Sequence, residues 1–578
     1  RPEVGDSSMD DTQEQEAMIM LMSTYEPAEI KFDEFRAPVS GYYDLTFSGY
    51  TIWMSLDFKT VSQGRRTEPV TIYSETPPRR LRRLGAFDFE PDPTRHHMRV
   101  WLKRGESIQP DATRLVRSRP PDFENPFEEE DGMPGVAFQW MEVEGPFYDQ
   151  WPEKGHQLLF GDLPIEDPAK ETREGEGDRR KHLLDTLVYG PRPFVEVQSR
   201  NPAKDAAKLL KHFMEAAYRR PVPKDEYQRF LALIEDTLGK GFNFVDSMIA
   251  GYTAVLSSPA FIYLEPTAPE LDGYALAERL SYFLWNSPPD TELLALAENG
   301  RIKNPYIKSQ QVERLLSDPR SERFVEAFLD YWLDLRKMGD SGPDAELYPE
   351  YQLDDSLTES MPRETRLYFA ELINQNLSVG HVVDSGFVFV NERLATLYDI
   401  PGVTGADIRK VVLPPESPRG GLMTQGSVLK VTANGTTSSP VIRGAWIMQR
   451  ILGKEIPPPP PSVKAIESDI RGAKTIREQL ALHRSQESCN KCHEKIDPAG
   501  FALESFDVMG GWRDRYRTTA KGQGEITSGV GHDGQDFRFK IGLPVDASGQ
   551  LPDGTPFQDI RELKALLLQD EEQLARNL

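Results

Sequence analysis

Long apolar runs and basic tracts are missing from this sequence, and each absence excludes a class of protein. The longest apolar stretch, residues 442–452, is broken by Arg443, Gln449 and Arg450, so nothing reaches the roughly 18–20 apolar residues of a membrane helix. Acidic residues outnumber basic ones by 92 to 68, which gives a formal net charge of -24. Because phosphate binding needs clustered Lys and Arg, the chain is not expected to bind DNA, RNA or anionic lipid.

Catalytic signatures are scarce as well. No Ser-His-Asp set, phosphate-binding loop or dinucleotide-binding glycine motif stands out, and the glycines at 421–426 form one isolated loop. Paired carboxylates are frequent in so acidic a chain, but no spacing distinguishes one pair. The sequence therefore gives no reason to expect a hydrolase or a nucleotide-dependent enzyme.

Cysteine is almost absent, and the only two cysteines share one C-x-x-C-H string, Cys489 to His493. Two thiols at this spacing can each add to one haem vinyl group, while the adjacent imidazole ligates the iron. Two alternatives stay open. A redox-active dithiol would need a strand-to-helix context, and a zinc site would need His493 to be joined by His483 or His532. We expect one covalent haem c held by Cys489, Cys492 and His493.

The sixth iron ligand would decide the function of such a haem. A sulfur or imidazole ligand closes the iron for electron transfer, whereas an open position admits peroxide. The candidates are Met423, Met509 and His483, and the remaining alternative is that none of them binds. Arg443 and Arg513 are predicted partners of the haem propionates, because a guanidinium matches a carboxylate, with ordinary surface arginines as the alternative.

Hydrophobic patterning predicts a multidomain α+β protein. Residues 1–170 alternate apolar and polar side chains in short runs, which is typical of a β-sandwich. Its aromatic residues Trp53, Trp101 and Tyr73 are predicted to fill the core, with stacking on sugar rings as the alternative. A linker is expected over 171–200, an all-α domain over 201–400, a mostly α cytochrome c-like haem domain over 401–520 and a C-terminal domain over 521–578.

Local signals add detail to these domains. Helical periodicity begins at Asn201, and Asp225 is predicted to cap the second helix. Further helices are expected over 274–285, 291–299, 321–335, 364–375 and 475–483. Five prolines at 457–461 predict a stiff polyproline strut. The Gly-rich tail after Tyr516 is expected to be irregular up to a helix over 559–577.

Several strings resemble one known family. Residues 432–446 (TANGTTSSPVIRGAW), 457–463 (PPPPPSV), 475–485 (TIREQLALHRS) and 489–516 (CNKCHEKIDPAGFALESFDVMGGWRDRY) are similar to planctomycetal-type c-type cytochromes. Residues 208–226, 256–266, 274–290 and 384–400 resemble the helical domains of that family. Residues 142–164 and the preceding β region resemble its carbohydrate-binding-type sandwich, and residues 543–560 resemble its C-terminal domain.

The sequence departs from that family at both ends. Many members carry a further C-x-x-C-H module near the N-terminus, so a second haem would need a segment before residue 1 or a partner. The family usually continues beyond the position of Leu578, so the C-terminal domain is expected to be incomplete. Arg1 in place of Met leaves open whether a signal peptide precedes it.

The resemblance and the haem motif imply a location and a role. Covalent haem attachment takes place outside the cytoplasm, so a periplasmic or cell-surface protein is expected. We expect electron transfer within a cell-envelope assembly, to a redox protein such as another cytochrome, and docking to a polysaccharide. Alternatives are a haem peroxidase or oxidase acting on envelope glycans or small phenols, and a structural or adhesive scaffold. Electron transfer is favoured over the enzyme because di-haem peroxidases need a second haem.

Overall fold

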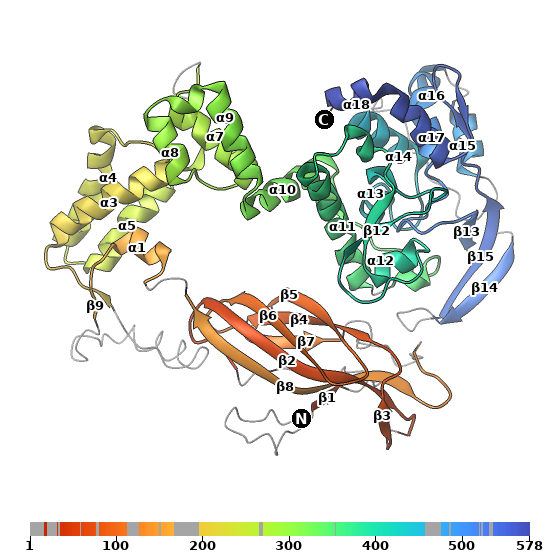
Figure 1. Ribbon diagram of the computed structural model, residues 1–578, viewed down its shortest axis with the longest axis horizontal. Coiled ribbons are helices and arrows are strands. Elements are labelled where there is room, and N and C mark those ends of the chain that lie inside the picture. The colour runs from red at the N-terminus through yellow and green to blue at the C-terminus, as the bar shows by residue number, and fades with distance from the viewer. Residues whose placement is uncertain are drawn as a thin grey trace.

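The chain folds into one β body and two mainly helical bodies, seen side by side in the computed structural model (Figure 1). The structure describes residues 17–19, 32, 35–57, 59–76, 80–112, 127–148, 152–166, 196–264, 270–352, 354–456, 475–484, 487–519, 521, 524–530 and 536–577. Helices and sheets are both abundant, which confirms the predicted multidomain α+β class. No helix within those ranges is long and apolar enough to cross a membrane.

The first body consists of two antiparallel sheets that enclose one core. One sheet has the order β1-β8-β2-β3, with β6 also paired to β2, and the other has the order β5-β4-β7. Phe47, Phe89 and Phe138 pack between them. The strands are β1 (Ala17–Ile19), β2 (Gly41–Met54), β3 (Val61–Gln63), β4 (Glu68–Thr76), β5 (Arg80–Phe89), β6 (Thr94–Leu102), β7 (Ser107–Asp111) and β8 (Met133–Phe147).

The second body is helical and contains two small cores, one around Leu210 and Tyr252 and one around Trp285. Its elements are α1 (Lys154–Phe160), β9 (Ile165–Glu166), β10 (Glu196–Val197), α3 (Pro202–Tyr218), α4 (Lys224–Gly239), α5 (Phe244–Leu256), α6 (Pro259–Ile262), α7 (Gly273–Trp285), α8 (Thr291–Glu298) and α9 (Pro305–Leu316). The prediction that Asp225 caps the second helix is wrong. Pro223 occupies the N-cap, and Asp225 lies in the first turn, where a carboxylate is favourable near the helix N-terminus.

The third body holds the C-x-x-C-H string. Its largest core joins residues from Val325 to Leu574, so side chains on both sides of positions 400 and 520 share it. The elements are α10 (Glu322–Trp332), α11 (Asp355–Asn374), β11 (Phe387–Val390), α12 (Glu392–Leu397), β12 (Arg409–Val412), α13 (Gly426–Val431), α14 (Pro440–Trp446), α15 (Ile476–His483), α16 (Glu487–Phe501), β13 (Arg515–Thr519), β14 (Glu525–Val530), β15 (Asp536–Pro544), β16 (Gly549–Gln550), β17 (Pro556–Phe557), α17 (Ile560–Leu567) and α18 (Glu571–Asn577).

The expectation of an irregular tail after Tyr516 is wrong. Strands β13, β15 and β14 form an antiparallel sheet in that order. Glycine is depleted in strands, so the local pattern did not predict a sheet here. The strands form because they pair with partners elsewhere in the chain. Most of the predicted linker, the five prolines at 457–461 and His532 lie outside the described residues.

Two polar contacts join the β body to the third body. Arg83 of β5 forms an ion pair with Glu359 of α11, with Nε 2.5 Å from Oε2. The backbone N–H of Ala406 donates to Asp88 Oδ2 at 2.5 Å. Burial raises the pKa of the Asp88 carboxyl.

Candidate functional site

Helix α16 carries the whole C-x-x-C-H string. Cys492 and His493 follow Cys489 by three and four positions in α16, and positions at this spacing share one face of a helix. Cys492 is half-buried and forms no disulfide, whereas the side chain of Cys489 lies outside the described part of the structure. The whole string therefore lies within one helix.

The imidazole of His493 is held by a carboxylate one turn farther along α16. Its Nδ1 lies 2.9 Å from Oδ1 of Asp497, which is fully buried. A carboxylate accepts the Nδ1 proton, so Nε2 is the nitrogen suited to bind a metal. Among the described residues, none donates a hydrogen bond to the second oxygen of Asp497, and Nε of Arg484 lies 3.9 Å from it. This donor set fits an axial histidine of a metal or haem centre.

The site helix is fixed by a close crossing with α14. A Cβ atom on Gly444 would lie 2.0 Å from the carbonyl oxygen of Ile496. A Cβ atom on Gly500 would lie 1.7 Å from the carbonyl oxygen of Pro440. Since real side chains do not tolerate such distances, only glycine at both positions lets the two backbones touch. The crossing sets the position of α16 in the core.

Arg443 anchors the chain that leaves α16. Its guanidinium is fully buried and donates to the carbonyl oxygens of Leu503, Phe506 and Asp507, each at 2.7 Å. Burial lowers the pKa of Arg443 to about 10. Its Nη1 also lies 3.6 Å from Oε1 of Glu504. The guanidinium therefore satisfies main-chain carbonyls, and its pairing with a propionate stays a prediction.

Arg513 binds the other side of the same acidic residue. Its Nε donates to the Glu504 carbonyl at 2.8 Å, and its Nη2 lies 3.2 Å from Glu504 Oε2 and 2.5 Å from Ser438 Oγ. Neither Arg443 nor Arg513 lies on the surface, so the alternative that they are ordinary surface arginines is wrong. Together they neutralise Glu504, which is completely buried. A propionate role for Arg513 is likewise still a prediction.

The three candidates for the sixth ligand lie in different surroundings. Met423 is fully buried in the large core beside residues such as Leu429 and Phe506. Met509 is buried in a neighbouring core, and its N–H donates to Asp507 Oδ1 at 2.8 Å. His483 ends α15, and its side chain is outside the described residues. The identity of the sixth ligand stays a prediction.

Three buried carboxylates around the site were given no role from the sequence. Asp497 orients His493, Glu504 joins the two arginines, and Asp507 accepts from Gly511 N–H at 2.8 Å and from Tyr351 at 2.8 Å. The spacing of Asp497, four residues after the histidine, is a signal that sequence reading missed. Glu504 also accepts from Ser438 and Asp507 from Tyr351, and these partners lie 66 and 156 residues away, which leaves no local signal. Within the described ranges, no group of three or more His, Cys, Asp or Glu side chains could hold a metal ion.

Three family models match consecutive segments of the chain within the second and third bodies. They are PSD5, a protein of unknown function (DUF1595), at residues 205–265; PSD4, a protein of unknown function (DUF1592), at 271–400; and PSCyt3, a protein of unknown function (DUF1588), at 419–516. All three belong to the planctomycete cytochrome-like domain series, which is consistent with a multidomain planctomycetal protein. The PSCyt3 match covers α14, α16 and Arg513. No curated protein and no solved structure gives a significant match.

Proposed function

We propose that this protein is an extracytoplasmic c-type cytochrome that holds one covalent haem and transfers electrons within a cell-envelope assembly. The observation that carries the proposal is the hydrogen bond between His493 and Asp497, on the same helix as both cysteines. It keeps the proton on Nδ1, which leaves Nε2 as the nitrogen that would bind iron. The match to PSCyt3 supports a cytochrome-like role for this body.

Each side chain of the site has a role in the proposal. Cys489 and Cys492 would form thioethers with the two vinyl groups, and His493 would supply Nε2 to the iron. A bound haem supplies a one-electron couple between ferric and ferrous iron. Asp497 holds the proton on Nδ1, and the buried Arg443 keeps the segment after α16 in place.

A second candidate function follows from the same carboxylate. A buried carboxylate that accepts from an iron-ligating histidine raises the basicity of the imidazole, which favours reactions with peroxide over simple electron transfer. This supports a haem peroxidase or oxidase acting on envelope glycans or small phenols. The occupancy of the sixth position separates the two functions.

An optical spectrum of the purified full chain, produced with haem-maturation machinery, tests both functions. We expect a c-type pyridine haemochrome with one haem per chain, and its loss in Cys492→Ala and Cys489→Ala. Replacement of exposed Ser317 by Ala is the matched control and should leave haem content unchanged. Absence of covalent haem in the unmodified chain would refute the proposal. A low-spin spectrum that does not change on addition of cyanide supports electron transfer. A high-spin spectrum that shifts on addition of peroxide supports the haem peroxidase or oxidase.

Location and partner belong to the same proposal. Because covalent haem attachment takes place outside the cytoplasm, the proposal includes a location in the periplasm or on the cell surface. The net charge of -24 favours a redox partner with a basic docking face, such as another cytochrome. Association with such a partner is expected to weaken steeply as ionic strength rises. An association rate that does not depend on salt would argue against a basic partner.

A further inference from the structure

Two buried polar atoms face each other beside the C-x-x-C-H string without forming a hydrogen bond. Nε of Arg484 lies 3.9 Å from Oδ2 of Asp497, which is within reach of an ion pair but beyond that of a hydrogen bond. Among the described residues, neither atom has a hydrogen-bond partner. A buried donor or acceptor that is left unpaired costs free energy, and more so when it is charged. The two atoms therefore need an approach of only about 1 Å to satisfy each other.

The carboxylate of Asp497 stands between two basic side chains. Its Oδ1 lies 2.9 Å from Nδ1 of His493, and its Oδ2 faces Arg484. The side chain of Asp497 is completely buried, whereas that of Arg484 is 27% exposed. A fully buried negative charge is stable only when it is paired. Because an imidazole that ligates a metal is neutral, the guanidinium of Arg484 is the cation that compensates Asp497 in this group of three.

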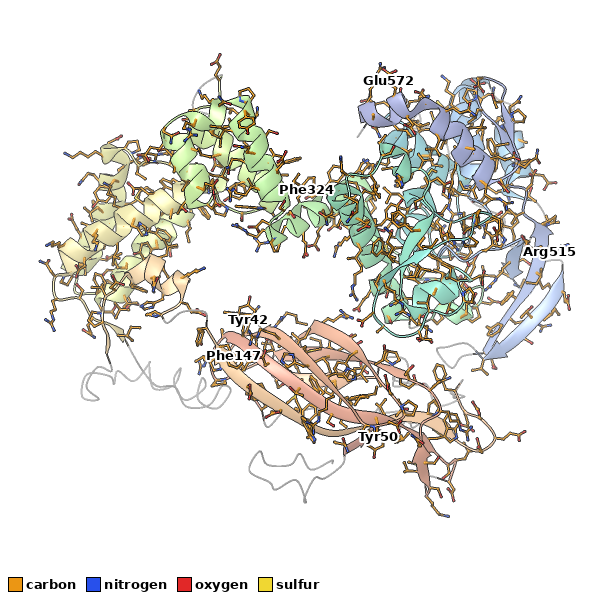
Figure 2. All side chains as sticks on the ribbon, in the orientation of Figure 1. Tyr42, Tyr50, Phe147, Phe324, Arg515 and Glu572 are labelled. Carbon is orange, nitrogen blue, oxygen red and sulfur yellow. The ribbon has the colours of Figure 1, made fainter. Side chains whose placement is uncertain are left out.

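Packing between α15 and α16 holds Arg484 in this place. Leu480 of α15 and Phe501 of α16 belong to one small core, against which Tyr516 packs. The N–H of Arg484 donates to the carbonyl oxygen of Leu480 at 2.9 Å, so its backbone continues the last turn of α15. Figure 1 shows α15 beside α16, and Figure 2 shows Arg515, the neighbour of Tyr516, on the side of the third body away from the second body. The side chain of Arg484 therefore starts from a fixed point next to α16.

The arginine inside α15 has different partners. Arg477 donates to the carbonyl oxygens of Asp546 and Ser548, and its guanidinium lies 3.9 Å from the centre of the Phe501 ring. Its Nε lies 3.0 Å from Oδ2 of Asp546. Arg477 is therefore held by the segment that follows β15, and Arg484 is the arginine of this region that pairs with Asp497.

We propose that Arg484 is a positioning residue that acts on the proposed haem iron through Asp497 and His493. This inference rests on the proposed function, because the iron would be bound by Nε2 of His493. A carboxylate beside a ligating histidine increases the electron density that the imidazole donates. A guanidinium on the second oxygen draws part of that charge to itself, so Arg484 limits the donation. The reduction potential is then higher than with an unpaired carboxylate, which favours electron transfer over reaction with peroxide.

Potentiometric titration of the haem-loaded full chain tests this role. We expect Arg484→Gln to lower the reduction potential, because the lost positive charge and the stronger carboxylate both stabilise ferric iron. Arg484→Lys keeps the positive charge and should restore most of the potential. Lys495→Gln, the matched control, removes the same charge from an exposed position on α16, where solvent screens it, and should shift the potential much less. An unchanged potential in Arg484→Gln, or an equal shift in Lys495→Gln, would overturn the proposal.

A double-mutant cycle shows whether Arg484 acts through Asp497. In the Asp497→Asn background, Arg484→Gln should lose most of its effect on the potential, because the carboxylate that carries the effect is absent. Two charges that act independently would instead give additive shifts. Additive shifts of the potential would contradict a role through Asp497.

Urea unfolding of the same four full-length proteins gives a readout that does not depend on haem. We expect each single variant to be less stable than the unmodified chain, and the double variant to lose less than the sum of both losses, because the two charges are paired. Additive losses would overturn the pair. If the losses are coupled but the unmodified chain carries no covalent haem, the proposed function fails and the role at the iron fails with it. If haem is present and the potential does not respond, only the positioning role fails.

Discussion

Nδ1 of His493 lies 2.9 Å from Oδ1 of Asp497, one turn farther along α16, and the carboxylate is completely buried. A buried carboxylate in this position makes an imidazole a stronger electron donor to any metal that its other nitrogen binds. The side chain that adjusts the proposed haem iron is therefore supplied by the same helix that carries the cysteines.

Replacing Asp497 by Asn is expected to raise the reduction potential of the haem protein by tens of millivolts. The amide of Asn is neutral, so the variant lacks the negative charge that stabilises ferric iron but keeps a group of similar size next to the imidazole. Potentiometric titration of the full chain measures the shift. Glu494→Gln removes the same charge from an exposed position on α16 and should change the potential much less. Equal shifts in both variants would show a general charge effect and remove the special role of Asp497.

Arg443→Met is expected to lower the free energy of unfolding of the third body by about 3 kcal/mol or more, because three buried carbonyl oxygens lose their donor. Urea denaturation followed by tryptophan fluorescence measures the loss. Arg409→Met is the control: it removes an exposed guanidinium that donates to the Thr404 carbonyl at 2.8 Å, and the expected change stays within about 0.5 kcal/mol. A small effect of Arg443→Met would mean that water replaces the guanidinium.

Gly500→Ala is expected to prevent the close crossing of α14 and α16. The added Cβ would lie 1.7 Å from the Pro440 carbonyl oxygen, so the helices must separate. We expect a loss of stability of about 3 kcal/mol or more and reduced covalent haem content, measured by urea denaturation and pyridine haemochrome. Gly239→Ala in α4, where a Cβ meets nothing within 4 Å, is the control and should be neutral or stabilising. A normally folded Gly500→Ala protein would contradict the crossing.

The stability of the third body is expected to fall as pH rises, because of Glu364. This carboxyl is fully buried in α11, and burial raises its pKa from 4.5 to about 8 although Tyr398 donates to it at 2.5 Å. Between these two values the folded protein holds a proton that the unfolded chain releases, so unfolding becomes easier with increasing pH. Below pH 4.5 both states are protonated, and the contribution no longer changes.

Thermal unfolding of the unmodified chain and of Glu364→Gln, measured from pH 5 to pH 9, checks this prediction. The difference in Tm between the two proteins should move in favour of the amide variant as pH rises, and should level off above about pH 8. Groups elsewhere in the chain cancel in this difference. Two parallel curves would show that the carboxyl does not titrate in that range.

Local features were predictable from the sequence to different degrees. The C-x-x-C-H string and the helix over 475–483 depend on neighbours three and four residues apart, and the structure has α15 and α16 there. The role of Asp497 depends on the same spacing, four residues after His493, and is therefore also predictable from the sequence. The sheet of β13, β15 and β14 was missed, since Gly529 and Gly542 weaken strand signals while the pairing partners that compensate are remote.

The sequence by itself determined the chemistry that is concentrated in one stretch of chain: two thiols, an imidazole and a carboxylate on successive turns of one helix. Only the tertiary structure decided which remote groups surround them. Arg443 reaches the carbonyl of Leu503 across 60 residues, and Tyr42 of β2 lies opposite Trp101 of β6 and Phe147 of β8 only because the three strands pair. Helical spacing is repeated in the sequence itself, whereas strand pairing and helix crossing depend on packing between distant segments.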